Sequence, residues 1–122
     1  MSAKYTGFPA LMYSGLYILK ELGILEKDYS DTEIKILVLI TDAPPAFLIC
    51  IDKGDFSIKI ENEIMNLVDI KEAKNLYDYY LAIPSDLLLE GADKIFQGIS
   101  QNTVKINDNK VLIYLGAIAS VF

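Results

Sequence analysis

The carboxyl-terminal segment, residues 110–122, constrains this chain more than any other feature because it is almost entirely apolar. It begins with Lys110, and no residue after Lys110 is charged. Chain ends are usually polar and frayed, so we expect this segment to be buried against its own domain, a partner subunit or an apolar ligand. A membrane-spanning helix needs roughly 20 apolar residues, so the segment is too short to cross a bilayer. What this segment covers therefore decides how the chain functions.

The charged residues exclude several classes of partner. The chain has 11 basic residues, all of them Lys, and a net charge of −6. Without Arg it lacks the bidentate group that best recognises phosphate and carboxylate. A negative chain is repelled by nucleic acid and by anionic membrane surfaces. We therefore expect no nucleic-acid partner and no stable membrane insertion.

The sequence also gives no sign of catalysis. It has no His, the usual general base and commonest metal ligand, and no phosphate-binding loop or nucleophile elbow. We expect no catalytic residue, no metal site and no cofactor, and the chain is predicted not to be an enzyme. Cys50 is the one cysteine, which excludes an intramolecular disulfide and fits a cytoplasmic location. Its apolar neighbours predict a buried thiol that acts as a small hydrophobe.

The length of 122 residues predicts a single domain over 1–122. Pro9 suits a first helical turn and Gly23 a helix end, so a helix is expected from about 8 to 23. One of its faces would carry Phe8, Leu11, Met12, Leu19 and Leu22. Two apolar runs flank a turn with two prolines, which predicts an antiparallel hairpin. Strands are expected at about 36–41, 46–52, 56–62, 78–83 and 103–107, with Ile64, Leu67 and Val68 extending the meander, and a helix at about 85–98.

The last segment has two interpretations. The turn-forming residues 107–109 followed by β-prone residues 111–115 indicate a hairpin whose second strand returns to the sheet. Small residues at 116, 117, 119 and 120 favour close helix packing instead. We choose a helix from about 109 to 122.

A family resemblance adds to this interpretation. The strand Tyr79–Ile83 is followed by Pro84-Ser85-Asp86 at a helix start, then by Gly91, Phe96-Gln97-Gly98, the strand Val104–Ile106 and an apolar carboxyl-terminal helix. This order resembles the sterol carrier protein type-two superfamily of small intracellular lipid carriers, over nearly the whole chain from about Leu11. The segment from Ser85 to Phe96 is shorter than is usual in that family.

The resemblance implies both a fold and a function. The fold is α+β, a curved and mostly antiparallel five-stranded sheet with amino-terminal, middle and carboxyl-terminal helices packed on one face. The function is non-catalytic binding or transfer of an elongated apolar ligand, such as a lipid, fatty acid, acyl chain or sterol-like molecule, in a tunnel between helices and sheet. The tunnel would be lined by Leu16, Leu19, Phe47, Ile49, Tyr79, Leu81, Leu88, Phe96, Leu112, Leu115, Ala119 and Phe122.

An alternative from another class uses the same apolar segment. The chain could be a protein-interaction module, or one half of a homodimer, in which residues 110–122 form the subunit interface and no ligand binds. The proposed tunnel residues would then be ordinary core or interface contacts.

Overall fold

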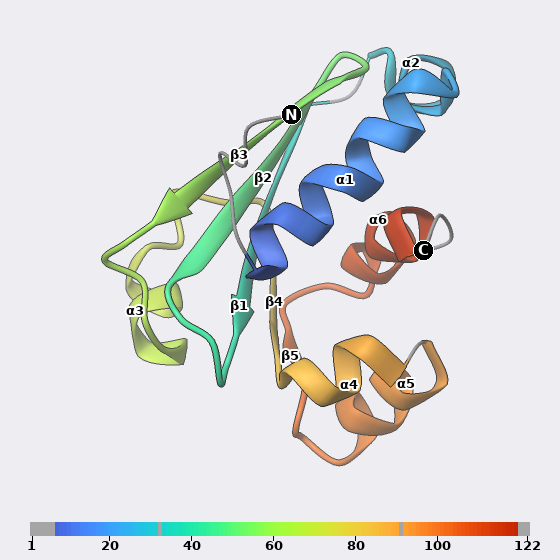
Figure 1. Cartoon of the computed structure of the whole chain (residues 1–122). Helices are drawn as coiled ribbons and strands as arrows, with labels where there is room; N and C mark the ends of the chain where they lie inside the picture. The colour runs from blue at the N-terminus through green and yellow to red at the C-terminus, as the bar shows by residue number, and fades with distance from the viewer. Residues whose placement is uncertain (1–6, 32, 91, 120–122) are drawn as a thin grey trace.

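The structure, a computed structural model, describes residues 7–31, 33–90 and 92–119. It has helices and a five-stranded, mixed, open sheet, so the predicted α+β fold class is confirmed. Figure 1 shows the sheet with most of the helices on one side of it. The helices are α1 (Gly7–Glu21), α2 (Ile24–Tyr29), α3 (Leu67–Glu72), α4 (Ser85–Glu90), α5 (Ala92–Ser100) and α6 (Lys110–Ala119).

The sheet has the strand order β3-β2-β1-β4-β5. β1 (Glu33–Ile40) pairs antiparallel with β2 (Ala46–Asp52) and parallel with β4 (Tyr79–Ile83). β3 (Asp55–Glu61) pairs antiparallel with β2, and β5 (Lys105–Ile106) pairs antiparallel with β4. The predicted hairpin of the first two strands is therefore confirmed, and the strand predicted over 46–52 has these bounds in the structure. β1 begins at Glu33, earlier than the predicted 36.

Alternation along the strands sends side chains to two separate apolar clusters. Ile36 and Val38 in β1 belong to the cluster under α1 and α6, together with Phe47 and Leu81 from neighbouring strands. Leu37 and its alternate neighbours belong to a second cluster on the opposite face. β1 alternates between exposed and buried residues over Glu33–Lys35 and is then continuously apolar and buried to Ile40, because a central strand is covered on both faces.

α1 packs on the sheet through Met12, Leu16 and Leu19, which are spaced by three and four residues and are all buried. At the β3 edge, the ring of Tyr13 meets the ring of Phe56 edge-on, with 5.2 Å between their centroids. The prediction that Leu22 shares the packed face is wrong. α1 ends at Glu21, and the Leu22 side chain is 66% exposed.

The segment between β3 and β4 also differs from the prediction. Ile64, Leu67 and Val68 were expected to extend the meander, but residues 67–72 form α3. The side chain of Asn66 accepts a hydrogen bond from the N–H of Asp69 and so caps this helix. Figure 1 shows α3 on the face of the sheet away from α1, and Ile70 packs there in the second cluster.

The carboxyl-terminal half contains helices on the α1 side of the sheet (Figure 1). The single helix predicted over 85–98 is two helices, α4 and α5, which pack on each other. The strand predicted over 103–107 is paired only at the two residues of β5, among those the structure describes. The choice of helix for the last segment is confirmed over Lys110–Ala119, and α6 packs against α1 and β4. Residues 120–122 lie outside the described residues.

Candidate functional site

Five of the predicted tunnel residues lie deep in the main core. Leu16 and Leu19 come from α1, and Phe47, Ile49 and Leu81 come from the sheet; none is more than 2% exposed. A side chain that a water-sized sphere cannot touch has no open cavity against it. At these five positions the space is filled by protein atoms, so a ligand there would have to displace them.

Three other predicted residues lie where packing is looser. Tyr79 of β4, Leu88 of α4 and Leu112 of α6 are half-buried and pack against the edge of the main core. The ring of Tyr79 meets the ring of Tyr114 of α6, with 5.7 Å between their centroids. We use the name half-buried cluster for the partly buried apolar residues of β4, β5, α4, α5 and α6 that pack against the main core. They are Tyr79, Leu87, Leu88, Ile95, Ile99, Ile106, Leu112 and Tyr114.

The remaining predicted residues do not join this cluster or are not described. Phe96 in α5 is 56% exposed, so it does not line an enclosed site. The side chains of Leu115 and Ala119 in α6 lie outside the described part, as does the whole of Phe122. The sequence-based prediction missed Leu87, Ile95, Ile99, Ile106 and Tyr114. Ile95 and Ile106 lay in a predicted helix and strand, but nothing in their spacing marked them as neighbours.

Hydrogen bonds at two turns position the helices that cover the half-buried cluster. The N–H and the hydroxyl of Ser85 both donate to the carboxylate of Asp42, at 2.8 and 2.5 Å, and so attach the start of α4 to the turn after β1. These two bonds hold the pKa of the Asp42 carboxyl below its ordinary value. The carboxylate of Asp108 accepts a hydrogen bond from the N–H of Lys110, which caps the first turn of α6.

A hydrogen-bonded asparagine continues the β4–β5 pairing beside this region. The Asn107 side chain accepts from the N–H of Tyr80 and donates to the carbonyl of Asp78. Because both bonds go to the backbone, they orient the chain just before α6. Among the described residues, no polar or charged side chain is buried. The space between the sheet and its helices is therefore apolar there.

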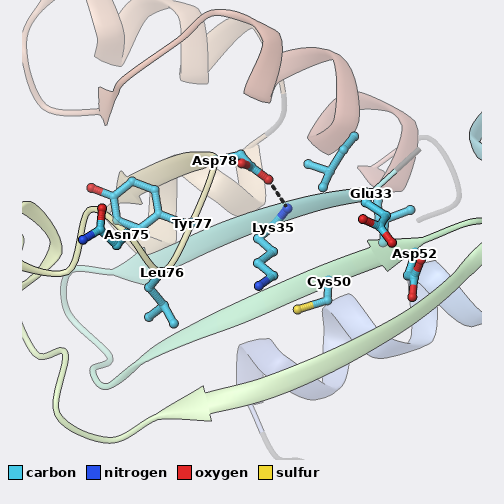
Figure 2. A pocket seen from close by; sticks show the side chains of 10 residues that line it. Glu33, Lys35, Cys50, Asp52, Asn75, Leu76, Tyr77 and Asp78 are labelled. Atoms are coloured by element: carbon cyan, nitrogen blue, oxygen red, sulfur yellow. Dashed lines mark hydrogen bonds between the residues drawn. The ribbon is translucent and has the colours of Figure 1, made fainter. Parts of the chain in front are cut away.

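The opposite face of the sheet carries a pocket of about 500 Å³. Figure 2 shows Lys35 and Cys50 on neighbouring strands, with Asn75, Leu76, Tyr77 and Asp78 on the segment that leads to β4. Glu33 and Asp52 lie at the end of the same two strands. The N–H of Lys35 donates to the carboxylate of Asp78 at 2.9 Å. The pocket is therefore lined by both acidic and basic side chains, together with the half-buried Cys50.

This pocket was not predicted. Cys50 was expected to be buried, but it is half-buried because it borders this pocket. Tyr77 also lines the pocket; its hydroxyl donates to the carbonyl of Ile70, and burial raises the pKa of its phenol. The alternation Glu33-Ile34-Lys35 was the signal that one face of the sheet is solvated at this end.

No group of three or more His, Cys, Asp or Glu side chains in the described part of the chain is arranged to hold a metal ion. Within the same residues, every helix is too short or too polar to cross a bilayer. Comparison with models of known protein families and with curated proteins finds no match for this chain.

Proposed function

We propose that this protein binds one elongated apolar molecule between the sheet and the helices α4 and α6, at the half-buried cluster. The observation that carries the proposal is the contrast within the core. Leu16, Phe47 and Ile49 are fully buried in the main core, whereas Tyr79, Leu88 and Leu112 are apolar but only half-buried at its edge. An apolar ligand placed against them would complete their burial.

The energetics are sufficient for this kind of ligand. Each methylene removed from water contributes about 0.8 kcal/mol. A dissociation constant of about 1 μM corresponds to about −8.2 kcal/mol, so roughly ten buried methylenes match it before the costs of association. A dodecyl chain or a sterol skeleton therefore has enough apolar surface. The order of sequence motifs from Tyr79 onward, which resembles that of the sterol carrier protein type-two superfamily, also motivates the proposal.

The proposal is tested with two neighbouring residues of α6. Leu112 is half-buried in the cluster, whereas Ile113 is 67% exposed. Leu112→Glu places a charge against the ligand and should weaken binding of the apolar dye Nile red at least about tenfold. Ile113→Glu adds the same charge in water and should leave the affinity unchanged. Thermal melts of both variants check that they are folded.

Extraction of the purified protein gives an independent readout. Organic extraction followed by mass spectrometry should find one apolar molecule per chain. Empty extracts, together with Nile red binding that Leu112→Glu does not weaken, would contradict the proposal.

A second candidate function is a homodimer, and exposed apolar side chains favour it. Ile18 lies in α1, Leu22 directly follows α1, and Ile113 lies on the neighbouring α6; they are 40%, 66% and 67% exposed. Burying a side chain of this size stabilises an interface by about 1.5–3 kcal/mol. Two copies that join these surfaces would also cover the apolar carboxyl-terminal helix.

Light scattering over a dilution series distinguishes this candidate from the first. The homodimer predicts a dimeric mass that Leu22→Lys with Ile113→Lys converts to a monomer. Val68→Lys is the matched control, because Val68 is 63% exposed but lies on α3 on the other face of the sheet. A monomer at all concentrations would exclude the dimer and leave ligand binding untouched.

A further inference from the structure

None of the lysines that the structure describes has its side chain in the half-buried cluster. The chain has no His, and all of its 11 basic residues are Lys. Every described lysine is exposed except Lys105, which is half-buried. Lys105 pairs with Ala82 across an antiparallel ladder, and residues directly opposite each other in such a ladder share a face. Ala82 belongs to the cluster on the α3 side, so Lys105 points away from the half-buried cluster.

The helices that contribute to the half-buried cluster carry more acidic than basic residues among those the structure describes. α4 carries Asp86 and Glu90, α5 carries Asp93, and Asp108 caps α6. Against these four exposed carboxylates, α5 and α6 carry one exposed lysine each, Lys94 and Lys110. This balance disfavours an anion near these helices, and the described lysines supply no buried cation to pair with it.

We infer that the ligand of this site carries an uncharged headgroup, an alcohol, an ester or a sterol-like hydroxyl, and not an ionised carboxylate. The inference rests on the proposed function and specifies its ligand class. Burying a carboxylate without a cationic partner costs far more than burying a hydroxyl. The half-buried Tyr79 offers a phenol that can donate to or accept from a neutral hydroxyl or ester.

Three probes with the same alkyl chain test the inference on the unmodified protein. Dodecan-1-ol, methyl dodecanoate and sodium dodecanoate are titrated at pH 8 against bound Nile red. We expect both neutral probes to displace the dye at concentrations at least about tenfold lower than dodecanoate. Displacement by dodecanoate at equal or lower concentration would overturn the inference while the proposed function stands. If neither Nile red nor any of the probes binds, the proposed function fails and the inference fails with it.

A charge placed in the cluster should reverse the preference. Leu88→Lys adds an ammonium group at α4, and we expect it to raise the affinity for dodecanoate relative to dodecan-1-ol at least about tenfold. Leu112→Lys makes the same change from α6, so the test does not depend on one variant being folded. Ile113→Lys is the matched control, because its ammonium group lies in water and should leave the ratio unchanged. An equal change in the ratio for Ile113→Lys would contradict the inference.

Discussion

Gly98→Ala gives a sharp test of how α5 is attached to the rest of the fold. A Cβ atom on Gly98 would lie 2.5 Å from Cγ2 of Val104 and 3.0 Å from Cδ1 of Leu87. Ordinary carbon–carbon contacts are about 3.5–4.0 Å, so the added methyl group overlaps its neighbour by roughly 1 Å. Val104 is 2% exposed and β-branched, and it therefore has little freedom to move aside.

The magnitude follows from two opposing effects. Replacing Gly by Ala within a helix favours the helix by up to about 1 kcal/mol. Overpacking a filled site costs about 1–3 kcal/mol, and the short contact with a stiff side chain favours the upper half of that range. We therefore expect Gly98→Ala to lower the free energy of unfolding by about 1–2 kcal/mol.

Urea unfolding followed by circular dichroism measures this difference, with Ser100→Ala as the control because Ser100 is exposed in the same helix. Ser100→Ala should change the free energy of unfolding by no more than about 0.5 kcal/mol. A stabilised Gly98→Ala protein would refute the reasoning, because it would mean that α5 does not pack against the segment that leads to β5.

Three further predictions concern the core, the turn at α4 and the second sheet face. Leu81→Ala removes a fully buried side chain and should lower the free energy of unfolding by about 2–5 kcal/mol. Val68→Ala, at an exposed position, should change it by no more than about 0.5 kcal/mol. Equal effects of the two substitutions in urea unfolding would contradict the described core. The pKa of the Asp42 carboxyl is lowered in the folded protein, so its contribution to stability is present above the ordinary carboxyl pKa and is lost as the pH falls through the lowered pKa. Ser85→Ala should raise the pKa of Asp42 in an NMR titration, because it removes the hydrogen bond from the hydroxyl. An unchanged pKa would show that this hydrogen bond is not the cause of the shift. Tyr77→Phe removes the hydrogen bond to the carbonyl of Ile70 and should lower the free energy of unfolding by about 0.5–1.5 kcal/mol. In the unmodified protein the pKa of the Tyr77 phenol is raised, so absorbance should show its ionisation above the ordinary pH range of tyrosine. The folded protein should lose stability as the pH rises through that raised pKa.

Much of the fold follows from local patterns in the sequence. Residues 56–61 alternate between apolar and polar, and in β3 Ile58 is buried whereas Ser57 and Lys59 are exposed. The continuous apolar runs of β1 and β2 predicted strands covered on both faces, as they are over most of their length. These patterns report which face of each helix or strand is buried, and they do so without indicating which other element buries it.

Two helix signals were present in the sequence but were not used. Asn66 and Asp69 cap α3 reciprocally, since Asn66 accepts from the Asp69 N–H and Asp69 accepts from the Met65 N–H. This spacing is that of a capping box, and it favours a helix over the strand that Ile64 and Val68 suggested. Asp108 caps α6 through a single hydrogen bond from the N–H of Lys110, and this cap favours the helix over the hairpin for the last segment.

The arrangement of the elements could not be predicted in the same way. The parallel pairing of β1 with β4 joins residues far apart in the sequence, and no local pattern encodes it. The predicted site residues were chosen for apolar character, which fully buried and half-buried positions share. Leu81 and Leu88 look alike in the sequence, yet Leu81 is fully buried in the sheet whereas Leu88 lies at the edge of the core.

Native mass spectrometry of the purified protein tests the central proposal most directly. The account predicts a monomeric chain that carries one uncharged apolar molecule, which dodecan-1-ol replaces at a concentration at least about tenfold lower than dodecanoate does. A ligand-free chain that takes up neither Nile red nor dodecan-1-ol would contradict it.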